Sequence, residues 1–203
     1  MSRFPRLPEE VFQRDHEFWS KYPIGLSAIG SPTIHPLKKL LILRKKTYIR
    51  HDFSGFKGDR KFVRDDDAQK AFSKLRSSIA GMYAYRLSPQ CSPTYRPKND
   101  VEHQQLVREA DFAFKQSFAF CPYSPEAVFR YVNLLLSLNR LDDALIVAQT
   151  CQKLDPYNDQ VTSLVGQLDQ FKKQGRSSNR DSDPIATDGK RSPHQYPLTF
   201  IIC

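Results

Sequence analysis

Apolar residues recur at steps of three and four along the second half of the chain, a spacing that places them on one face of an α-helix. Short polar breaks divide the pattern. The second stretch begins at Ser124 and Pro125, which are favoured as helix cap and first helical residue, and Asn158 is a cap of the same kind. The pattern predicts four consecutive helices, at about 100–120, 125–137, 141–154 and 158–175.

Another helix is predicted upstream, over about 66–86. Asp65 to Asp67 open it, and carboxylates stabilise a helix N-terminus through capping and the helix dipole. Three aspartates also suggest a metal site, but no His or Glu stands at ligand spacing, so capping is favoured. The residues expected to form the buried face are Ala68, Ala71, Phe72, Leu75, Ile79, Met82 and Tyr83.

The chain aligns with itself at an offset of 34 residues, the spacing of tetratricopeptide repeats, in which each unit is a pair of antiparallel helices. Ala110 falls on Ala144, where a small side chain lets two helices approach closely, and each unit ends at a Pro-Tyr pair. The predicted repeat-packing residues are Ala110, Phe114, Pro122, Ala144, Ala148 and Pro156.

These helices make one full repeat, the second half of another and a closing helix. The missing first helix would fall near 91–98, where "CSPTYRPK" holds two prolines. About three repeats are needed to bury a continuous core, so we expect the array to pack on the upstream helix. The predicted all-α organisation is an N-terminal segment (1–22), an anomalous basic, proline-rich stretch (23–47), a loop and helix (48–98), a tetratricopeptide-like region (99–175) and a disordered, Ser-, Asp-, Pro- and Arg-rich tail (176–203).

Two stretches, "YIRHDFSGFKGDRKFVRDDDAQKAFSKLRSSIAGMYAYR" and "EADFAFKQSFAFCPYSPEAVFRYVNLLLSL", carry a family resemblance. Over roughly residues 48–170 the chain resembles the C-terminal soluble region of the bacterial protein O-mannosyltransferase-like membrane glycosyltransferases. Such proteins place a multi-span catalytic portion ahead of this region and are thought to transfer a sugar from a lipid carrier to protein. The resemblance implies the accessory helical part alone, within a membrane-embedded parent, and it carries over no catalytic residue.

Residues 23–46 hold three prolines, two glycines, five basic residues and no acid, and we expect no native helix there. We hypothesise that this stretch is translated out of frame. With suitable synonymous codons, the DNA shifted by two bases reads without a stop as an acidic, helical segment similar to what the family carries at this place. The codons of the gene test this hypothesis.

The net charge of +9 is concentrated at one end: residues 1–64 carry 14 Lys and Arg against 6 Asp and Glu. This charge supports an alternative function, a basic nucleic-acid-binding protein. The missing recognition motif and the frame hypothesis count against it, so no nucleic acid is expected as partner. A third alternative is a membrane-surface segment at 37–50, but its apolar residues are clustered and not striped.

The titratable residues form no nucleophile–base pair at a motif spacing, so we expect no enzymatic activity and no cofactor. The four cysteines, Cys91, Cys121, Cys151 and Cys203, show no C-x-x-C or metal spacing and are expected to be buried or incidental thiols. No signal peptide or membrane span is predicted, which favours a soluble, cytoplasmic chain, or a membrane-associated one within the parent. The expected function is a non-catalytic helical scaffold or interaction module, with a protein or neighbouring domain as partner.

Overall fold

A computed structural model describes residues 9–20, 37–56 and 59–178 of the chain. Within these ranges the protein is all-α, as expected, and no residue lies in a strand. The helices are α1 (Glu9–Ser20), α2 (Leu37–Arg44), α3 (Arg60–Arg64), α4 (Asp66–Leu87), α5 (Asp100–Phe120), α6 (Pro125–Ser137), α7 (Leu141–Leu154) and α8 (Asp159–Ser178), with a π-helix η2 (Lys45–Ile49) and a 3₁₀ turn η3 (Pro93–Tyr95).

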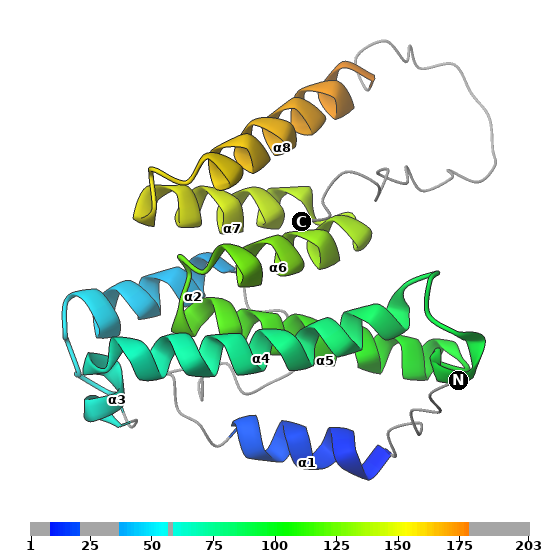
Figure 1. Cartoon of the computed structure of the whole chain (residues 1–203), viewed down its shortest axis with the longest axis horizontal. Coiled ribbons are helices and arrows are strands. Elements are labelled where there is room, and N and C mark those ends of the chain that lie inside the picture. The colour runs from blue at the N-terminus through cyan, green and yellow to red at the C-terminus, as the bar shows by residue number, and fades with distance from the viewer. Residues whose placement is uncertain (1–8, 21–36, 57–58, 179–203) are drawn as a thin grey trace.

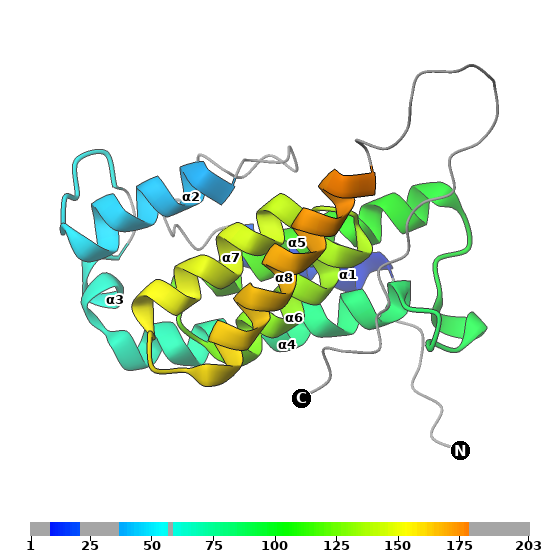
Figure 2. The ribbon, with the colours of Figure 1, turned by 90° about the horizontal axis from the view of Figure 1, so that it is seen from above.

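The helices form a stack of antiparallel neighbours (Figures 1 and 2). The long hairpin of α4 and α5 lies in the middle of the stack in Figure 1, with α1 on one side of it and α6, α7 and α8 in succession on the other. Helix α2 packs against α5 and α7. The array therefore leans on the upstream helix α4, as the incomplete repeat predicted.

Polar side chains cap the N-termini of several helices at the positions that the sequence predicted. The Asp65 carboxylate accepts the Ala68 backbone N–H (2.9 Å), and Asn99 and Asn158 cap α5 and α8 in the same way. Each cap satisfies a backbone donor that has no partner inside its own helix. Ser124 stands at the cap position of α6, but its side chain makes no capping hydrogen bond, and Pro125 occupies the first helical position.

The turn between α6 and α7 is closed by Asn139, whose positive φ of 57° places it in the left-handed region. The Arg140 N–H donates to the Leu135 carbonyl (2.8 Å), and the Asn139 N–H donates to the Leu136 carbonyl (3.0 Å). This pair of bonds is a Schellman motif, and asparagine tolerates the left-handed conformation better than most residues. The motif fixes Arg140 immediately after the turn, where its side chain enters the network described below.

Helix α5 is the centre of the molecule. Every residue from Ala113 to Phe120 is buried, including Lys115, Gln116 and Ser117. Such a helix needs neighbours on all sides, and α2, α4 and α6 all pack against it. Its aromatic residues fill the spaces between these helices: Phe114 stacks on Tyr131 of α6 with ring centroids 5.4 Å apart, and Phe120 meets Phe72 of α4 at 6.0 Å.

Only part of the face predicted for α4 is buried: Tyr83 lies in the core and Phe72 and Ile79 pack against it, but other predicted residues face outward. Leu75 and Met82 are each 54% exposed, whereas the residues facing the interior are mostly small or polar. These residues can face the interior because α5 presents small residues opposite them, so that the two helices approach closely. The small residues of α5 include Ala110, Ala113 and Ser117. The buried residues of α4 are Gln69, Ser73, Arg76, Ser77, Ala80 and Tyr83.

Three other expectations need correction. Residues 37–44 form helix α2, although no native helix was expected there: Leu37 and Leu40 are 1% and 3% exposed, and their burial stabilises the helix. Helix α1 was not predicted as an element. Helix α8 continues through Gly175 to Ser178, so the predicted tail boundary at 176 is too early. The remainder of that tail lies outside the described residues.

Candidate functional site

Four of the predicted repeat-packing residues belong to the hydrophobic core: Ala110, Phe114, Ala144 and Ala148. Ala110 and Ala144, 34 residues apart, are both fully buried, and so is Ala148, while Phe114 is 1% exposed. The residues at 125–154 form the expected helical hairpin, α6 and α7. The two prolines differ: Pro122 is buried, whereas Pro156 is exposed. Both stand directly after a helix end, but only the first also contributes to the core.

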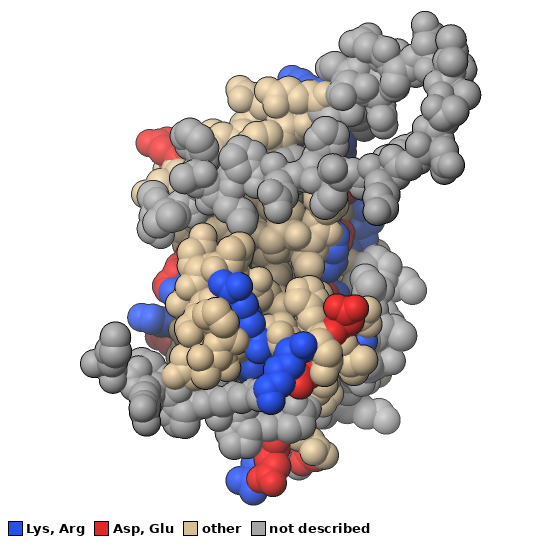
Figure 3. Space-filling view, turned by 90° about the vertical axis from the view of Figure 1, so that its right-hand side faces the viewer, with Lys and Arg blue, Asp and Glu red and all other residues tan. Residues whose placement is uncertain are grey.

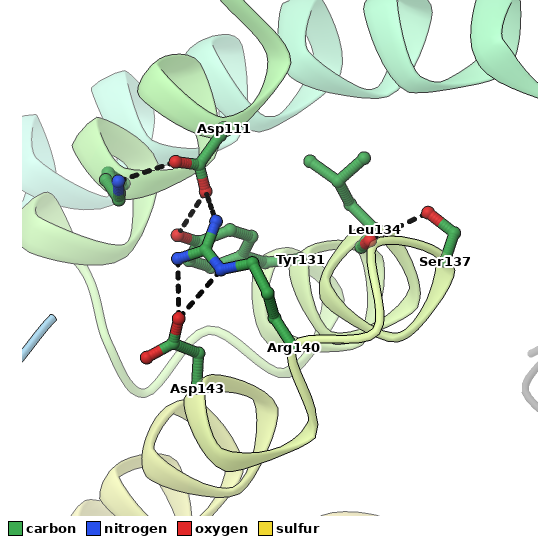
Figure 4. A network of polar contacts seen from close by, with 7 residues as sticks. Asp111, Tyr131, Leu134, Ser137, Arg140 and Asp143 are labelled. Atoms are coloured by element: carbon green, nitrogen blue, oxygen red, sulfur yellow. Dashed lines mark hydrogen bonds and ion pairs between the residues drawn. The ribbon is translucent and has the colours of Figure 1, made fainter. Parts of the chain in front are cut away.

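A network of charged groups joins the first hairpin, α4 and α5, to the second hairpin, α6 and α7 (Figure 4). Asp111 of α5 lies at its centre. One carboxylate oxygen pairs with the Lys115 ammonium one turn further along α5 (2.5 Å), and the other accepts both the Tyr131 hydroxyl of α6 and Nη1 of Arg140 (2.9 Å each). Arg140 also pairs with Asp143, through Nη2 at 2.6 Å and Nε at 2.8 Å. The network ties α5, α6 and the start of α7 together.

Burial shapes the ionisation of this network. The phenol of Tyr131 is fully buried beside a carboxylate, so burial and then the negative charge of Asp111 raise its pKa well above the ordinary value. For Arg140, burial acts to lower the pKa, but Asp111 and Tyr131 act to raise it and prevail. The guanidinium therefore stays charged, and the phenol serves as a hydrogen-bond donor.

A second polar centre lies on the other side of the first hairpin, between α1, α4 and α5. The Arg76 guanidinium of α4 is completely buried, with Nη1 2.7 Å from the Asp15 carboxylate of α1 and Nε 2.7 Å from the Gln116 amide oxygen of α5. It also lies over the Trp19 ring at 4.9 Å. Burial lowers the pKa of Arg76, and the Asp15 carboxylate acts in the opposite direction. The amide nitrogen of Gln116 donates to the Trp19 carbonyl at the end of α1 (3.0 Å).

A third polar contact seals α4 to α5. The Ser73 hydroxyl donates to the Ser117 carbonyl (2.9 Å), and the Ser117 hydroxyl donates to the Ser73 carbonyl (2.8 Å). Both side chains are completely buried. The bonds cross between helices and do not return to a carbonyl of the same helix, so they fix the register of α4 on α5.

The sequence reasoning missed these polar centres. It named Ala110 and Ala144 but not their neighbours Asp111 and Arg140, and it assigned no role to Asp15, Arg76 or Trp19. One available signal was the spacing of residues 12, 15, 16 and 19, which places two aromatic residues, an acid and a histidine on one face of a short helix. Arg76 itself gave no signal, because nothing local distinguishes an arginine that will be buried.

Several basic residues behind the nucleic-acid alternative have internal roles. Arg44 donates to the Ala119 carbonyl (3.1 Å), and Lys46 donates to the Ser54 carbonyl (2.9 Å). On the face shown in Figure 3, basic side chains are interspersed with acidic ones and with large areas of neither. Of the apolar residues behind the membrane-surface alternative, Leu37 and Leu40 lie in the core, whereas Ile42 is 67% exposed.

The described residues contain no group of three His, Cys, Asp or Glu side chains that could hold a metal ion. The aspartates at the start of α4 act as a cap and in exposed ion pairs of Lys70 with Asp66 and Asp67. Cys91, Cys121 and Cys151 are free and buried, as expected, and Cys203 lies outside the described residues. Burial raises the pKa of Cys151 to about 12, which makes this thiol unreactive at neutral pH.

Within residues 9–20, 37–56 and 59–178, no helix has both the length and the apolar character that crossing a bilayer requires. Comparison of the whole chain with protein families, curated proteins and solved structures found no match.

Proposed function

We propose that the chain is a non-catalytic helical-repeat scaffold that binds another protein domain. In this proposal the chain is the accessory C-terminal part of a membrane protein O-mannosyltransferase-like glycosyltransferase. The observation that carries the proposal is the succession of helices α5 to α8, in which Ala110 and Ala144, 34 residues apart in the sequence, are both fully buried. Stacked helical hairpins of this kind commonly present surfaces to partner proteins.

The internal use of charged groups supports a role without catalysis. Arg140 is paired with both Asp111 and Asp143, and Asp15 and Arg76 form a second internal pair. A catalytic group needs access to a substrate and a pKa suited to proton transfer. The burial of these groups in partnered arrangements serves the packing of helices.

The outer side of α4 provides the surface for a partner. Leu75 and Met82, two turns apart on this helix, are each 54% exposed, and Tyr85 is 55% exposed. Apolar residues aligned along an exposed helix are typical of a surface that another protein covers. The partner that we propose is the membrane-spanning portion of the parent, because the resemblance covers a soluble region that follows such a portion.

The test begins with the DNA on either side of the reading frame. The proposal expects a membrane-spanning reading frame directly upstream; co-expressed with this chain, its product should copurify with it in detergent. Leu75→Ser with Met82→Ser should reduce this association at least about tenfold, while the control Val101→Ser on α5, where the side chain is even more exposed, should not. The absence of such a frame, or association that ignores both α4 substitutions, would contradict the proposal.

The same sequencing tests the out-of-frame hypothesis for residues 23–46. Since Leu37 and Leu40 already pack in the core in the present frame, one reason for that hypothesis is removed. If the native codons, shifted by two bases, contain a stop, the hypothesis is wrong.

A further inference from the structure

Helix α1 contacts the rest of the molecule through one narrow face. Its outer side includes Val11 and Phe18, which are 39% and 50% exposed. The contacting residues are spaced at i, i+3, i+4 and i+7, the arrangement by which an amphipathic helix fits into a groove on another protein. These residues are Phe12, Asp15, His16 and Trp19.

Two aromatic anchors hold the ends of this face. Near the start of α1, the Phe12 ring packs on Tyr83 of α4 with centroids 5.1 Å apart. Near its end, Trp19 is 2% exposed and meets Phe72 of α4 at 6.0 Å and Phe120 of α5 at 6.4 Å. Both anchors pack on the surface that α4 and α5 form beneath α1, and this surface is called the groove below.

Between the anchors the groove carries a cationic centre that accepts a carboxylate. Asp15 receives Nη1 of Arg76 (2.7 Å) and the Tyr83 hydroxyl (2.9 Å) on a single oxygen, Oδ2. Nη2 of Arg76 is buried and has no hydrogen-bond partner among the described residues. Arginine binds a carboxylate best through two parallel N–H bonds. The surface under α1 thus holds an acidic side chain, and the guanidinium that binds it keeps one nitrogen without a hydrogen-bond partner.

The connection between α1 and the remainder of the fold is long. Sixteen residues, 21–36, separate the end of α1 from the start of α2, and a chain of this length can span up to about 50 Å. Departure of α1 from the groove therefore does not require α2 to move. In this respect α1 resembles a peptide ligand tethered to its own binding site.

We propose that the groove between α4 and α5 is a binding site for an amphipathic helix of a partner protein, in which an aspartate lies between two aromatic residues at the spacing of Phe12, Asp15 and Trp19. Helix α1 occupies this groove in cis, and the partner helix replaces it. Charge complementarity selects the partner, because the buried Arg76 requires a carboxylate. An apolar residue at the position of Asp15 would leave the guanidinium without its paired anion. The inference rests on the proposed role as an interaction module.

The single tryptophan of the chain makes the exchange measurable. Full-length protein labelled with 5-fluorotryptophan gives one ¹⁹F resonance, from Trp19 in the groove. An unlabelled peptide of residues 8–22 should displace α1 and produce a second resonance at the position of exposed tryptophan. Because a tethered helix acts at an effective concentration on the order of millimolar, displacement is expected at millimolar peptide.

Two matched peptides set the specificity. Asp15→Ala in the peptide should weaken displacement at least about tenfold, while Val11→Ala, on the outer side of the helix, should leave it unchanged. Equal displacement by the Asp15→Ala peptide would overturn the proposal. A concentration-dependent dimer of the unmodified chain, with the second copy's α1 in the groove, would overturn the assignment to a partner protein.

A second measurement applies if α1 is bound too tightly for the peptide to displace it. In the full chain, Phe12→Ala with Trp19→Ala removes both anchors, and a fluorescent peptide of residues 8–22 should then bind at least about tenfold more tightly than to the unmodified protein. Failure of both experiments contradicts the groove. Neither uses the upstream polypeptide or the Leu75 and Met82 stripe, so the groove and the proposed parentage can fail separately.

Discussion

The two helical hairpins of this protein bury different kinds of residue at their seams. Between α4 and α5 the contact includes Ser73, Ser77 and Ser117, all of them 2% exposed or less. Between α6 and α7 the buried residues are aliphatic, with Leu135 and Ala148 fully buried. Both hairpins pack closely because small side chains lie where the helices meet. The comparison shows that a seam can be built with polar side chains, as at Ser73 and Ser117, or with aliphatic ones, as at Leu135 and Ala148.

The difference has a consequence for the surface. In the second hairpin the apolar stripes of the helices are used inside, as an isolated amphipathic helix would suggest. In the first, polar residues of α4 take the inner positions and leave Leu75 and Met82 outside. The hairpin with the polar seam is therefore the one that carries both the exposed apolar stripe and the groove for α1.

The largest effect should come from the network that joins the two hairpins. Asp111→Ala leaves the buried Lys115 and the half-buried Arg140 without their shared carboxylate, although Arg140 keeps its pair with Asp143, and it should lower the free energy of unfolding by about 3 to 5 kcal/mol. Urea unfolding measures this loss. The control is Asp142→Ala, which removes the exposed pair with Lys172 and should cost less than about 1 kcal/mol. Equal effects for the two would mean that the network is not buried.

The next effect tests the small residues of the repeat. Ala144→Leu inserts three carbon atoms where no space remains and should lower the free energy of unfolding by about 1 to 3 kcal/mol. Ala71→Leu makes the same change on the exposed side of α4, and its free energy of unfolding should lie within about 0.5 kcal/mol of that of the unmodified protein. Denaturant unfolding of the pair decides, and a neutral Ala144→Leu would rule out close packing at that position.

A smaller effect is expected at the polar seam of the first hairpin. Ser117→Ala removes the hydroxyl that donates to the Ser73 carbonyl, at an expected cost of about 1 to 2 kcal/mol. Ser78→Ala is the control, because its hydroxyl donates to Lys74 of the same helix on the exposed side. If thermal unfolding gives the same stability for both variants, the seam is held by other contacts.

The smallest effect is a loss of stability at alkaline pH. Burial raises the pKa of Cys151 from 9.0 to about 12, so the unfolded chain loses this proton first and the folded state is favoured only while the thiol stays protonated. Stability should therefore fall as the pH rises above about 9, by roughly 1 kcal/mol between pH 8 and 9.5. Urea unfolding at both pH values measures the change. Cys151→Ala should remove most of this dependence; an unchanged slope would show that other groups cause it.

The sequence allowed much of the second hairpin to be predicted. Helical spacing located α5 to α8 within a few residues, and the 34-residue offset singled out Ala110 and Ala144, which are both fully buried. These features depend on local patterns of apolar and capping residues. The same reasoning placed α4 correctly along the chain, from Asp66 to Leu87, and predicted the burial of Tyr83, but it wrongly placed Leu75 and Met82 on the buried face.

The error on α4 has a physical cause. Periodicity locates an apolar stripe, but the side that a helix buries depends on what its neighbour presents. Ser73 is buried because Ser117, 44 residues later, satisfies its hydroxyl, and Arg76 is buried because Asp15 and Gln116 reach it from two other helices. Long-range partners of this kind leave no trace in a local pattern. The polar centres could therefore not be found from the sequence alone.

The orientation of α4 is the claim on which both proposed surfaces depend, and a cross-link tests it most directly. Ser73→Cys with Ser117→Cys should form a disulfide under mild oxidation, because the two hydroxyl oxygens lie 3.2 Å apart across the seam. Peptide mapping by mass spectrometry identifies the linked pair. Ser78→Cys with Ser117→Cys, on the exposed side of the same helix, should stay reduced. A disulfide from position 78 and none from position 73 would show that α4 turns its apolar stripe inward, and would contradict this account.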